Sequence, residues 1–358
     1  MLRSIDYSGL IYPVDPHSVS AFTKSHRGLF GFSQLGVKAK VVGVALFAVF
    51  FAVIVGTQIF GVLSSIVRSA LAEGAWLTAI PVLVLVVVFF AITGGASYVG
   101  IRAWRRGGGP WQRFYRMNKF AEDNGLTFTP LDTRINYPGL IFDEGGTRSI
   151  RNRFRSSEGR TLDYGNYRYV TGSGKNRQTH NWGFMALELD RALPHMVLDA
   201  RSNNKLFGVS NLPQSFAKNQ VLKLEGDFNA HFTLYCPREY ERDALYIFTP
   251  DLMALLIDHA APYDVEVIDK WLLVYSPKDF DLVDPAQHRR LLGIADTVGA
   301  KTLRQSRHYA DERIGDSSVN LVAPQGQRLK AGVSTVAVAM VVIVAALWIV
   351  PFMFRMVS

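Results

Sequence analysis

The chain has 358 residues, with 39 Lys and Arg against 30 Asp and Glu, a formal net charge of +9 and a sequence pI of about 9.6. Hydrophobic residues make up 49% of the chain, the mean hydropathy is +0.11, and Cys236 is its single cysteine. One cysteine excludes a scaffold held by intrachain disulfides, and the apolar content argues against a largely disordered chain. The composition predicts apolar segments that alternate with basic ones.

Three segments carry no charged side chain: 41–67, 74–101 and 331–354. Each is longer than the roughly 20 apolar residues that cross a hydrocarbon core of about 30 Å. We therefore expect three transmembrane helices and the lipid bilayer as a partner. These segments also lack ionisable side chains, which argues against a transporter.

The basic residues that flank these segments indicate the orientation of the chain in a plasma membrane. They cluster before the first segment, after the second and before the third. This predicts a multi-pass protein with a cytoplasmic N-terminal segment (1–40), a large cytoplasmic domain and an external tail (355–358). Small residues in the second segment, such as Ala91 and Gly95, allow close helix packing. We favour packing within one chain over a homo-oligomer.

Residues 105–122 predict a glycine-rich hinge followed by an amphipathic basic helix. Its aromatic residues either lie at a membrane surface with anionic lipid headgroups or pack into the core of the following domain. The candidate residues for binding anionic lipid or another polyanion in this segment are Arg105, Arg106, Arg113, Arg116 and Lys119.

Residues 123–330 predict one α+β domain with a mainly antiparallel sheet and a few helices. Alternating segments at 150–155, 160–171 and 179–189 are typical of strands that return through hairpins, and 196–198 indicates a further short strand. Thr249-Pro250-Asp251 and Asp284-Pro285 are typical helix starts. Because strands outnumber helices without regular β-α-β alternation, a parallel sheet is not expected.

The strongest charged pattern is Arg151, Arg153 and Arg155, which alternation places on one exposed face of a strand. We favour charge that discourages edge pairing. Binding of anionic lipid headgroups or another polyanion is a second interpretation. Nucleic-acid binding is a third and less favoured one, which neighbouring tyrosines would support by base stacking.

No catalytic, cofactor or metal motif emerges from the sequence. The loop 171–176 lacks the Ser or Thr and the following helix of a phosphate-binding loop. The weak catalytic candidates are His180, His195, Asp199 and Arg201, and we favour structural roles for all four. We expect neither a cofactor nor a metal.

Residues 222–276 resemble an uncharacterised family of bacterial membrane-anchored proteins with a cytoplasmic domain of unknown function. The resemblance lies in Phe228 and Phe232, in the helix start at Thr249 and Pro250, and in the hairpin that follows. It implies a structural motif and assigns no catalytic residue.

The leading functional hypothesis is a non-enzymatic, membrane-tethered module that binds a protein partner at the inner leaflet. The alternative is a membrane-proximal enzyme that acts on a lipid or anionic substrate. Nucleic-acid binding through the basic strand is the third hypothesis.

Overall fold

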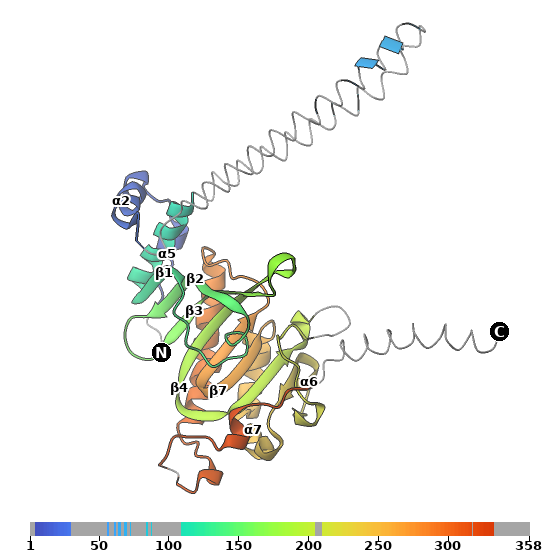
Figure 1. Ribbon diagram of the computed structural model, residues 1–358. Helices are drawn as coiled ribbons and strands as arrows, with labels where there is room; N and C mark the ends of the chain where they lie inside the picture. Colours follow the sequence, from blue (N-terminus) through green and yellow to red (C-terminus); the bar gives the residue numbers. More distant parts are fainter. Residues whose placement is uncertain are drawn as a thin grey trace, which may run out of the picture. The chain divides into compact units, whose positions relative to one another are not determined.

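The computed structural model describes residues 4–29, 109–204, 210–316 and 318–332, with single helical positions at 56, 61, 64, 65, 68, 69, 72, 84 and 87 (Figure 1). The chain divides into two compact units. One unit is Val14–Tyr115, and the other combines Met1–Pro13 with Arg116–Ser358. Each is described by itself.

In the smaller unit, α2 (Pro16–His26) begins at a complete N-cap. The Asp15 carboxylate accepts the N–H groups of His17 and Ser18 at 3.2 and 3.1 Å. These bonds satisfy donors that the first helical turn leaves unpaired. The ring of Phe22 lies 6.2 Å from that of Trp111, at the start of α5 (Pro110–Asp123). The predicted basic helix therefore coincides with α5, which continues into the larger unit.

The larger unit is built on a seven-stranded sheet in the order β1-β2-β3-β4-β6-β5, with β7 paired to β4. All its ladders are antiparallel. The strands are β1 (Leu126–Asp132), β2 (Gly146–Ser156), β3 (Leu162–Thr171), β4 (Gln178–Ala200), β5 (Val221–Leu222), β6 (Phe232–Tyr235) and β7 (Asp264–Ser276).

The strand β4 is 23 residues long and pairs with β3, β6 and β7. The sequence predicted two separate strands here, at 179–189 and 196–198. Register shifts against β7 lie between Glu188 and Leu193 and between Leu193 and Met196. Such irregularities bend a strand without ending it, so the structure has the single strand β4 where the sequence predicted two strands.

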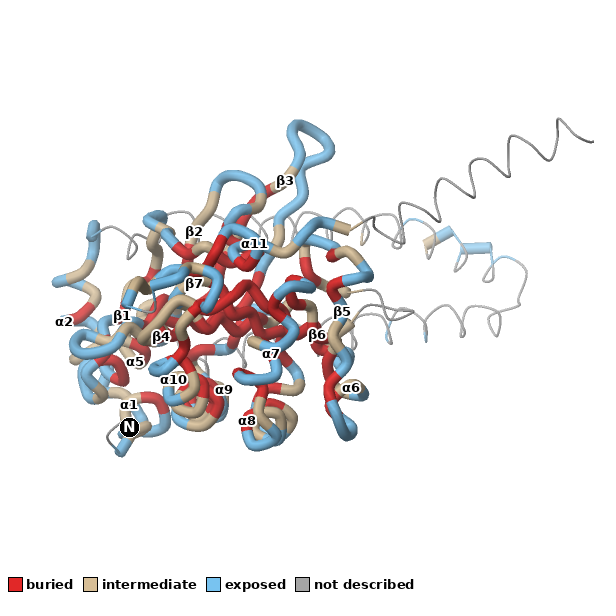
Figure 2. Tube along the Cα trace, turned by 90° about the horizontal axis from the view of Figure 1, so that it is seen from below, coloured by how far each residue is buried: buried red, intermediate tan, exposed pale blue. Residues whose placement is uncertain are grey.

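The helices of this unit are α1 (Ser8–Ile11), α5, α6 (Phe228–His231), α7 (Glu241–Ile247), α8 (Pro250–Leu255), α9 (Pro285–Ile294), α10 (Ala300–Ser306) and α11 (Pro324–Gln327). Figure 2 shows α8, α9 and α10 grouped on one side of the sheet. Both predicted helix starts are confirmed. The Asp284 carboxylate accepts the Ala286 N–H at 2.9 Å, whereas the buried Thr249 hydroxyl makes no capping bond.

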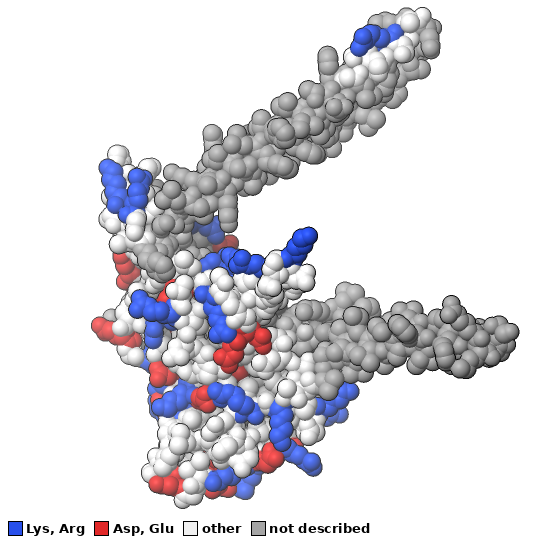
Figure 3. Space-filling model, in the orientation of Figure 1, with Lys and Arg blue, Asp and Glu red and all other residues white. Residues whose placement is uncertain are grey.

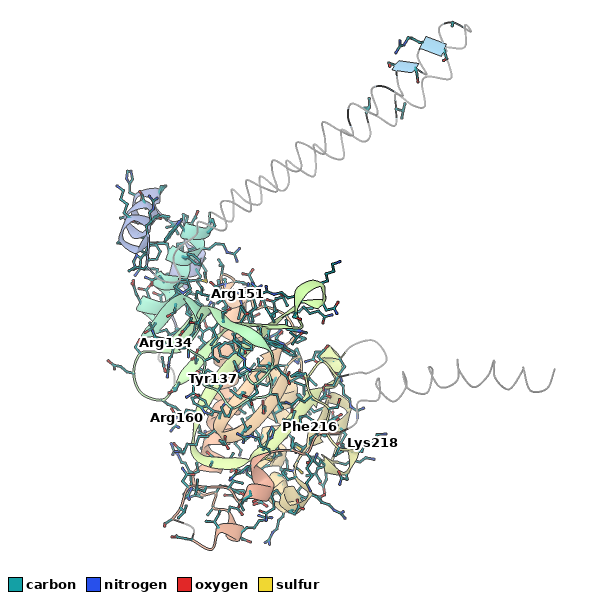
Figure 4. All side chains as sticks on the ribbon, in the orientation of Figure 1. Arg134, Tyr137, Arg151, Arg160, Phe216 and Lys218 are labelled. Carbon is teal, nitrogen blue, oxygen red and sulfur yellow. The ribbon has the colours of Figure 1, made fainter. Side chains whose placement is uncertain are left out.

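Different segments of the chain pack on the two faces of the sheet. On β3, the Tyr164 hydroxyl lies 3.0 Å from Nδ1 of His288 on α9. Tyr167 instead packs against Phe142, from the connection between β1 and β2, with ring centroids 4.7 Å apart. Positions three apart on a strand project to opposite faces. The helices therefore cover one face, and the 133–145 connection covers the other, where Tyr137 lies over the sheet (Figure 4).

The predicted membrane arrangement requires correction. Among the described residues, no helix is long and apolar enough to cross a membrane. The longest described helix, α5, has 14 residues. At 1.5 Å per residue it reaches roughly 21 Å, short of a core of about 30 Å, and it carries arginines. The predicted segments 41–67, 74–101 and 331–354 lie outside the described residues, apart from single positions and residues 331–332.

The fold class supported by the structure is mixed α/β with an antiparallel sheet. The three transmembrane helices, and the multi-pass plasma-membrane location that followed from them, are not supported.

Candidate functional site

The structure does not gather the four weak catalytic candidates into one site. His180 lies near the start of β4, where its Nε2 is 2.8 Å from the Thr171 hydroxyl and its ring stacks on Tyr169. His195 lies near the other end of the same strand. Asp199 and Arg201 follow it, Asp199 as the penultimate residue of β4 and Arg201 just beyond the strand.

His195 has a structural role because both of its ring nitrogens are occupied. The Leu329 N–H donates to Nδ1 over 3.0 Å, so the ring proton resides on Nε2. That Nε2–H donates to Oε1 of Glu266 over 2.8 Å. The side chain is 3% exposed. The imidazole therefore has no free nitrogen with which to move a proton to or from a substrate.

Glu266 joins three parts of the chain through its carboxylate. Besides His195, it accepts the backbone N–H of Leu140 at 2.9 Å and the hydroxyl of Tyr275 at 2.6 Å. Burial, and then the charge of Glu266, raises the pKa of Tyr275 well above its usual range. The 133–145 connection and the 327–332 segment are thus fixed to the same face of the sheet.

The three arginines of β2 do not share one exposed face, which corrects the sequence prediction. The register of β2 against β3 shifts between Arg151 and Phe154, and Asn152 has a φ of 51°. A bulge of this kind changes the side to which the following residues project. Arg153 is consequently only 7% exposed, while Arg155 is exposed.

The buried Arg153 is held by acidic partners. Its Nε lies 2.9 Å from Oδ2 of Asp163, which is 0% exposed, and its Nη1 lies 2.5 Å from Oδ2 of Asp132. The hydroxyl of Tyr137 also donates to Asp163. Arg151 is paired as well, 2.8 Å from Asp279. Neither arginine presents a free charge to a polyanion.

The other predicted basic residues have separate environments. On α5, Arg116 donates to the carbonyl of Leu10 and Lys119 pairs with Asp123. Arg113 is exposed, and Arg105 and Arg106 lie outside the described residues. Figure 3 shows basic and acidic side chains interspersed over the visible face. Polyanion binding by these residues stays a prediction.

A surface hollow of about 160 Å³ lies near the outer edge of the sheet beside β5 and β6. We call it the cationic hollow, and its lining residues are Asn219, Gln220, Pro237, Arg238, Glu239, Gln325, Arg328 and Lys330. Lys218, labelled in Figure 4, immediately precedes the first of them. The residues come from three distant segments, so no local sequence pattern indicated this site.

Hydrogen bonds hold the walls of the hollow together. The Gln220 side chain accepts the Lys330 N–H at 2.8 Å and donates to the Lys330 carbonyl at 2.8 Å. Its backbone carbonyl accepts the Cys236 N–H at 2.9 Å. Tyr240 directly follows the lining residue Glu239, and its hydroxyl donates to Asp311 over 2.6 Å. The hollow is therefore preformed.

The charge of the hollow is positive, with three cations against the single carboxylate of Glu239. Arg328 is partly neutralised by Asp269, 3.2 Å away. Within the part of the chain that the structure describes, the side chains of Arg238 and Lys330 form no ion pair or hydrogen bond. These two charges are available to an anionic group.

Exposed apolar side chains occur in the segments that contribute to the hollow or directly adjoin it in sequence. Between residues 109 and 332, the large apolar side chains described as exposed are Val221 (38%), Leu245 (54%), Tyr246 (48%) and Leu321 (59%). Val221 follows Gln220, and Leu245 and Tyr246 lie on α7, which begins two residues after Glu239. Leu321 lies shortly before the lining residue Gln325. Each therefore belongs to a segment that forms the hollow.

No protein-family model matches the chain, and no curated protein matches it. A solved structure with partial similarity is the crystal structure of the mycobacterial trehalose monomycolate transport factor A, TtfA. The match has 12% identity and a TM-score of 0.34, and covers 54% of this chain and 91% of that chain. The chain thus has a weak, partial resemblance to a bacterial protein. Membership of the family suggested by residues 222–276 stays a prediction.

Proposed function

We propose that this chain is a non-enzymatic interaction module, and that it binds a protein partner at the cationic hollow and its apolar border. The observation that carries the proposal is that the segments forming the hollow carry both the unpaired Arg238 and Lys330 and the exposed side chains of Val221, Leu245, Tyr246 and Leu321. Protein interfaces combine apolar contacts with polar groups that determine orientation.

The chemistry of the hollow indicates what the partner presents. A volume of about 160 Å³ admits a side-chain carboxylate but not a drug-sized ligand. Two unpaired cations favour an Asp or Glu side chain, with which Arg238 can form a bidentate pair. Leu245 and Tyr246 on α7 would contact apolar residues beside that carboxylate. The proposed partner surface is therefore an acidic residue with apolar neighbours.

The enzyme hypothesis has no comparable support. A pocket that joins two of the weak catalytic candidates would support it, but His180 and His195 lie near opposite ends of β4, and none of the four candidates lines the cationic hollow. The hypothesis of nucleic-acid binding through β2 required exposed arginines, whereas Arg153 is buried and Arg151 is paired. We therefore pursue neither as a proposal.

Photo-crosslinking in the producing cells tests the proposal. A benzophenone amino acid replaces Tyr246, and the captured proteins are identified from the full-length chain. The same residue is then placed in the Arg238→Glu/Lys330→Glu variant. The control variant, Lys175→Glu/Arg177→Glu, makes the same charge change at exposed positions of the loop between β3 and β4.

We expect a reproducible adduct with one protein that persists in the control and falls at least tenfold in the hollow variant. That loss corresponds to about 1.4 kcal/mol. No reproducible adduct, or equal capture by the hollow variant, would refute the proposal. An adduct of twice the mass of the chain would show self-association, and would refute a separate protein partner.

A further inference from the structure

The segment around Leu329 forms part of the wall of the cationic hollow and is extended. Arg328 has a φ of −144° and a ψ of 140°. Successive side chains of an extended chain project to opposite sides. Leu329 packs against the buried aromatic cluster on the sheet, whereas Arg328 and Lys330 line the hollow. The position of these two cations therefore depends on how the backbone at Leu329 is held.

A buried hydrogen bond holds this backbone from the interior of the sheet. The N–H of Leu329 donates to Nδ1 of His195 over 3.0 Å. Nδ1 can accept only when the imidazole is neutral and carries its proton on Nε2. Glu266 selects that tautomer, because its Oε1 lies 2.8 Å from Nε2. The side chains of His195 and Glu266 are 3% and 0% exposed, so both bonds are shielded from water.

The Glu266 carboxylate gives His195 a fixed support. Its second oxygen, Oε2, accepts the Leu140 N–H at 2.9 Å and the Tyr275 hydroxyl at 2.6 Å, so the carboxylate cannot turn freely. The Gln220 side chain, which binds the backbone of Lys330, belongs to the lining of the hollow itself. Gln220 therefore joins two lining segments to each other, whereas His195 joins one of them to the sheet.

We propose that His195 is a positioning residue for the hollow: through the N–H of Leu329 it fixes Lys330 and Arg328 where they receive the carboxylate of the partner. This inference rests on the proposed function. Apolar side chains of similar volume would fill the space of His195 and Glu266 without removing a carboxylate from water. They would not accept the Leu329 N–H, and the two cations would lose their support.

Two variants of similar shape separate the two bonds of His195. In His195→Asn, the amide oxygen takes the place of Nδ1 and can accept the Leu329 N–H, while the bond to Glu266 is lost. In His195→Gln, the amide nitrogen takes the place of Nε2 and can donate to Glu266, while the bond to Leu329 is lost. The control, His180→Gln, changes a histidine near the other end of β4.

The test uses the full-length chain and two measurements. Hydrogen exchange of the Leu329 amide is measured without any partner, and urea unfolding gives the stability of each variant. The adduct formed by the benzophenone amino acid at the position of Tyr246 is then measured in the producing cells. The first measurement reports the support of the wall, and the second reports binding at the hollow.

We expect His195→Gln to raise the exchange rate of the Leu329 amide at least tenfold and to lower the adduct at least fivefold. His195→Asn should keep both within threefold of the native chain, even if urea shows the two variants to be equally destabilised. His180→Gln should change neither.

Equal exchange rates, or equal adduct yields, in the two His195 variants would overturn the proposal, because a purely structural role depends on both bonds. A native Leu329 amide that exchanges as fast as that of the exposed Leu321 would also overturn it. A native chain without an adduct would refute the proposed function alone, and the exchange rates would still support or overturn the role of His195.

Discussion

Replacing Arg153 with Met provides the most direct check on the buried ion pair beneath the 133–145 connection. The substitution removes the guanidinium from a site where it is 7% exposed and leaves the Asp163 carboxylate 0% exposed. Among the residues that the structure describes, Tyr137 would then be the side-chain donor left to Asp163. Breaking a buried pair on one side costs about 3–5 kcal/mol. For a domain of this size that corresponds to a fall of roughly 6–20 °C in the unfolding midpoint.

The assay is urea unfolding followed by circular dichroism, with Arg155→Met as the control on the same strand. Because Arg155 is exposed, its substitution should change the free energy of unfolding by no more than about 0.5 kcal/mol. The double variant Arg153→Met/Asp163→Asn removes both charges and should recover about half of the loss or more. A cost below about 1 kcal/mol for Arg153→Met, or no recovery in the double variant, would refute our interpretation of the site.

Three further predictions concern packing, reactivity and pH. Gly139→Ala should lower the free energy of unfolding by about 1–3 kcal/mol, because the new Cβ would lie 2.1 Å from the Tyr275 hydroxyl oxygen. Gly146→Ala, with open space at that position, serves as the control in the same denaturant assay, and equal effects would contradict the packing argument. Burial raises the pKa of the Cys236 thiol to about 12, so this thiol should react with a disulfide reagent at pH 8 only after unfolding in urea. Burial, with the charge of Asp199 contributing, raises the pKa of Asp264 from 3.8 to about 7, so between these values the folded chain keeps a proton that the unfolded chain has lost. The protonated Asp264 carboxyl therefore makes its full contribution to the free energy of unfolding below pH 4. That contribution falls by about 4 kcal/mol as the pH rises from 4 through 7. Asp264→Asn should flatten this part of the pH–stability profile measured by urea unfolding, and an unchanged profile would contradict the assignment of this titration to Asp264.

Local patterns were sufficient to predict parts of this fold. The hairpin of β3 and β4 and the antiparallel sheet follow from alternating polarity, and the start of α9 follows from Asp284 and the proline after it. The hairpin expected after the helix start at Thr249 and Pro250 was wrong: residues 264–276 form the single strand β7, which pairs with β4 along its length and passes through Asp269 without turning back. The helix at 110–123 follows from its amphipathic pattern. Each of these features depends on residues that lie within the same helical turn or the same strand. A short stretch of sequence is therefore enough to predict it.

The same reasoning failed where a bulge or a distant segment intervened. Alternation placed Arg151, Arg153 and Arg155 on one face, but the irregularity at Asn152 directs Arg153 to the buried Asp163. The apolar segments led to a membrane arrangement that the described residues do not support.

The sequence by itself determined the helix starts at Pro250 and Pro285 and the strands that became β2, β3 and the first part of β4, because helix-start residues and side-chain alternation act over a few residues. Only the tertiary structure decided which ionisable groups are paired, buried or available to a ligand. The cationic hollow unites segments near residues 220, 238 and 328, and the His195–Glu266 pair unites two strands. A charge acquires its function from partners and solvent exposure, and both depend on residues brought together only when the sheet has formed.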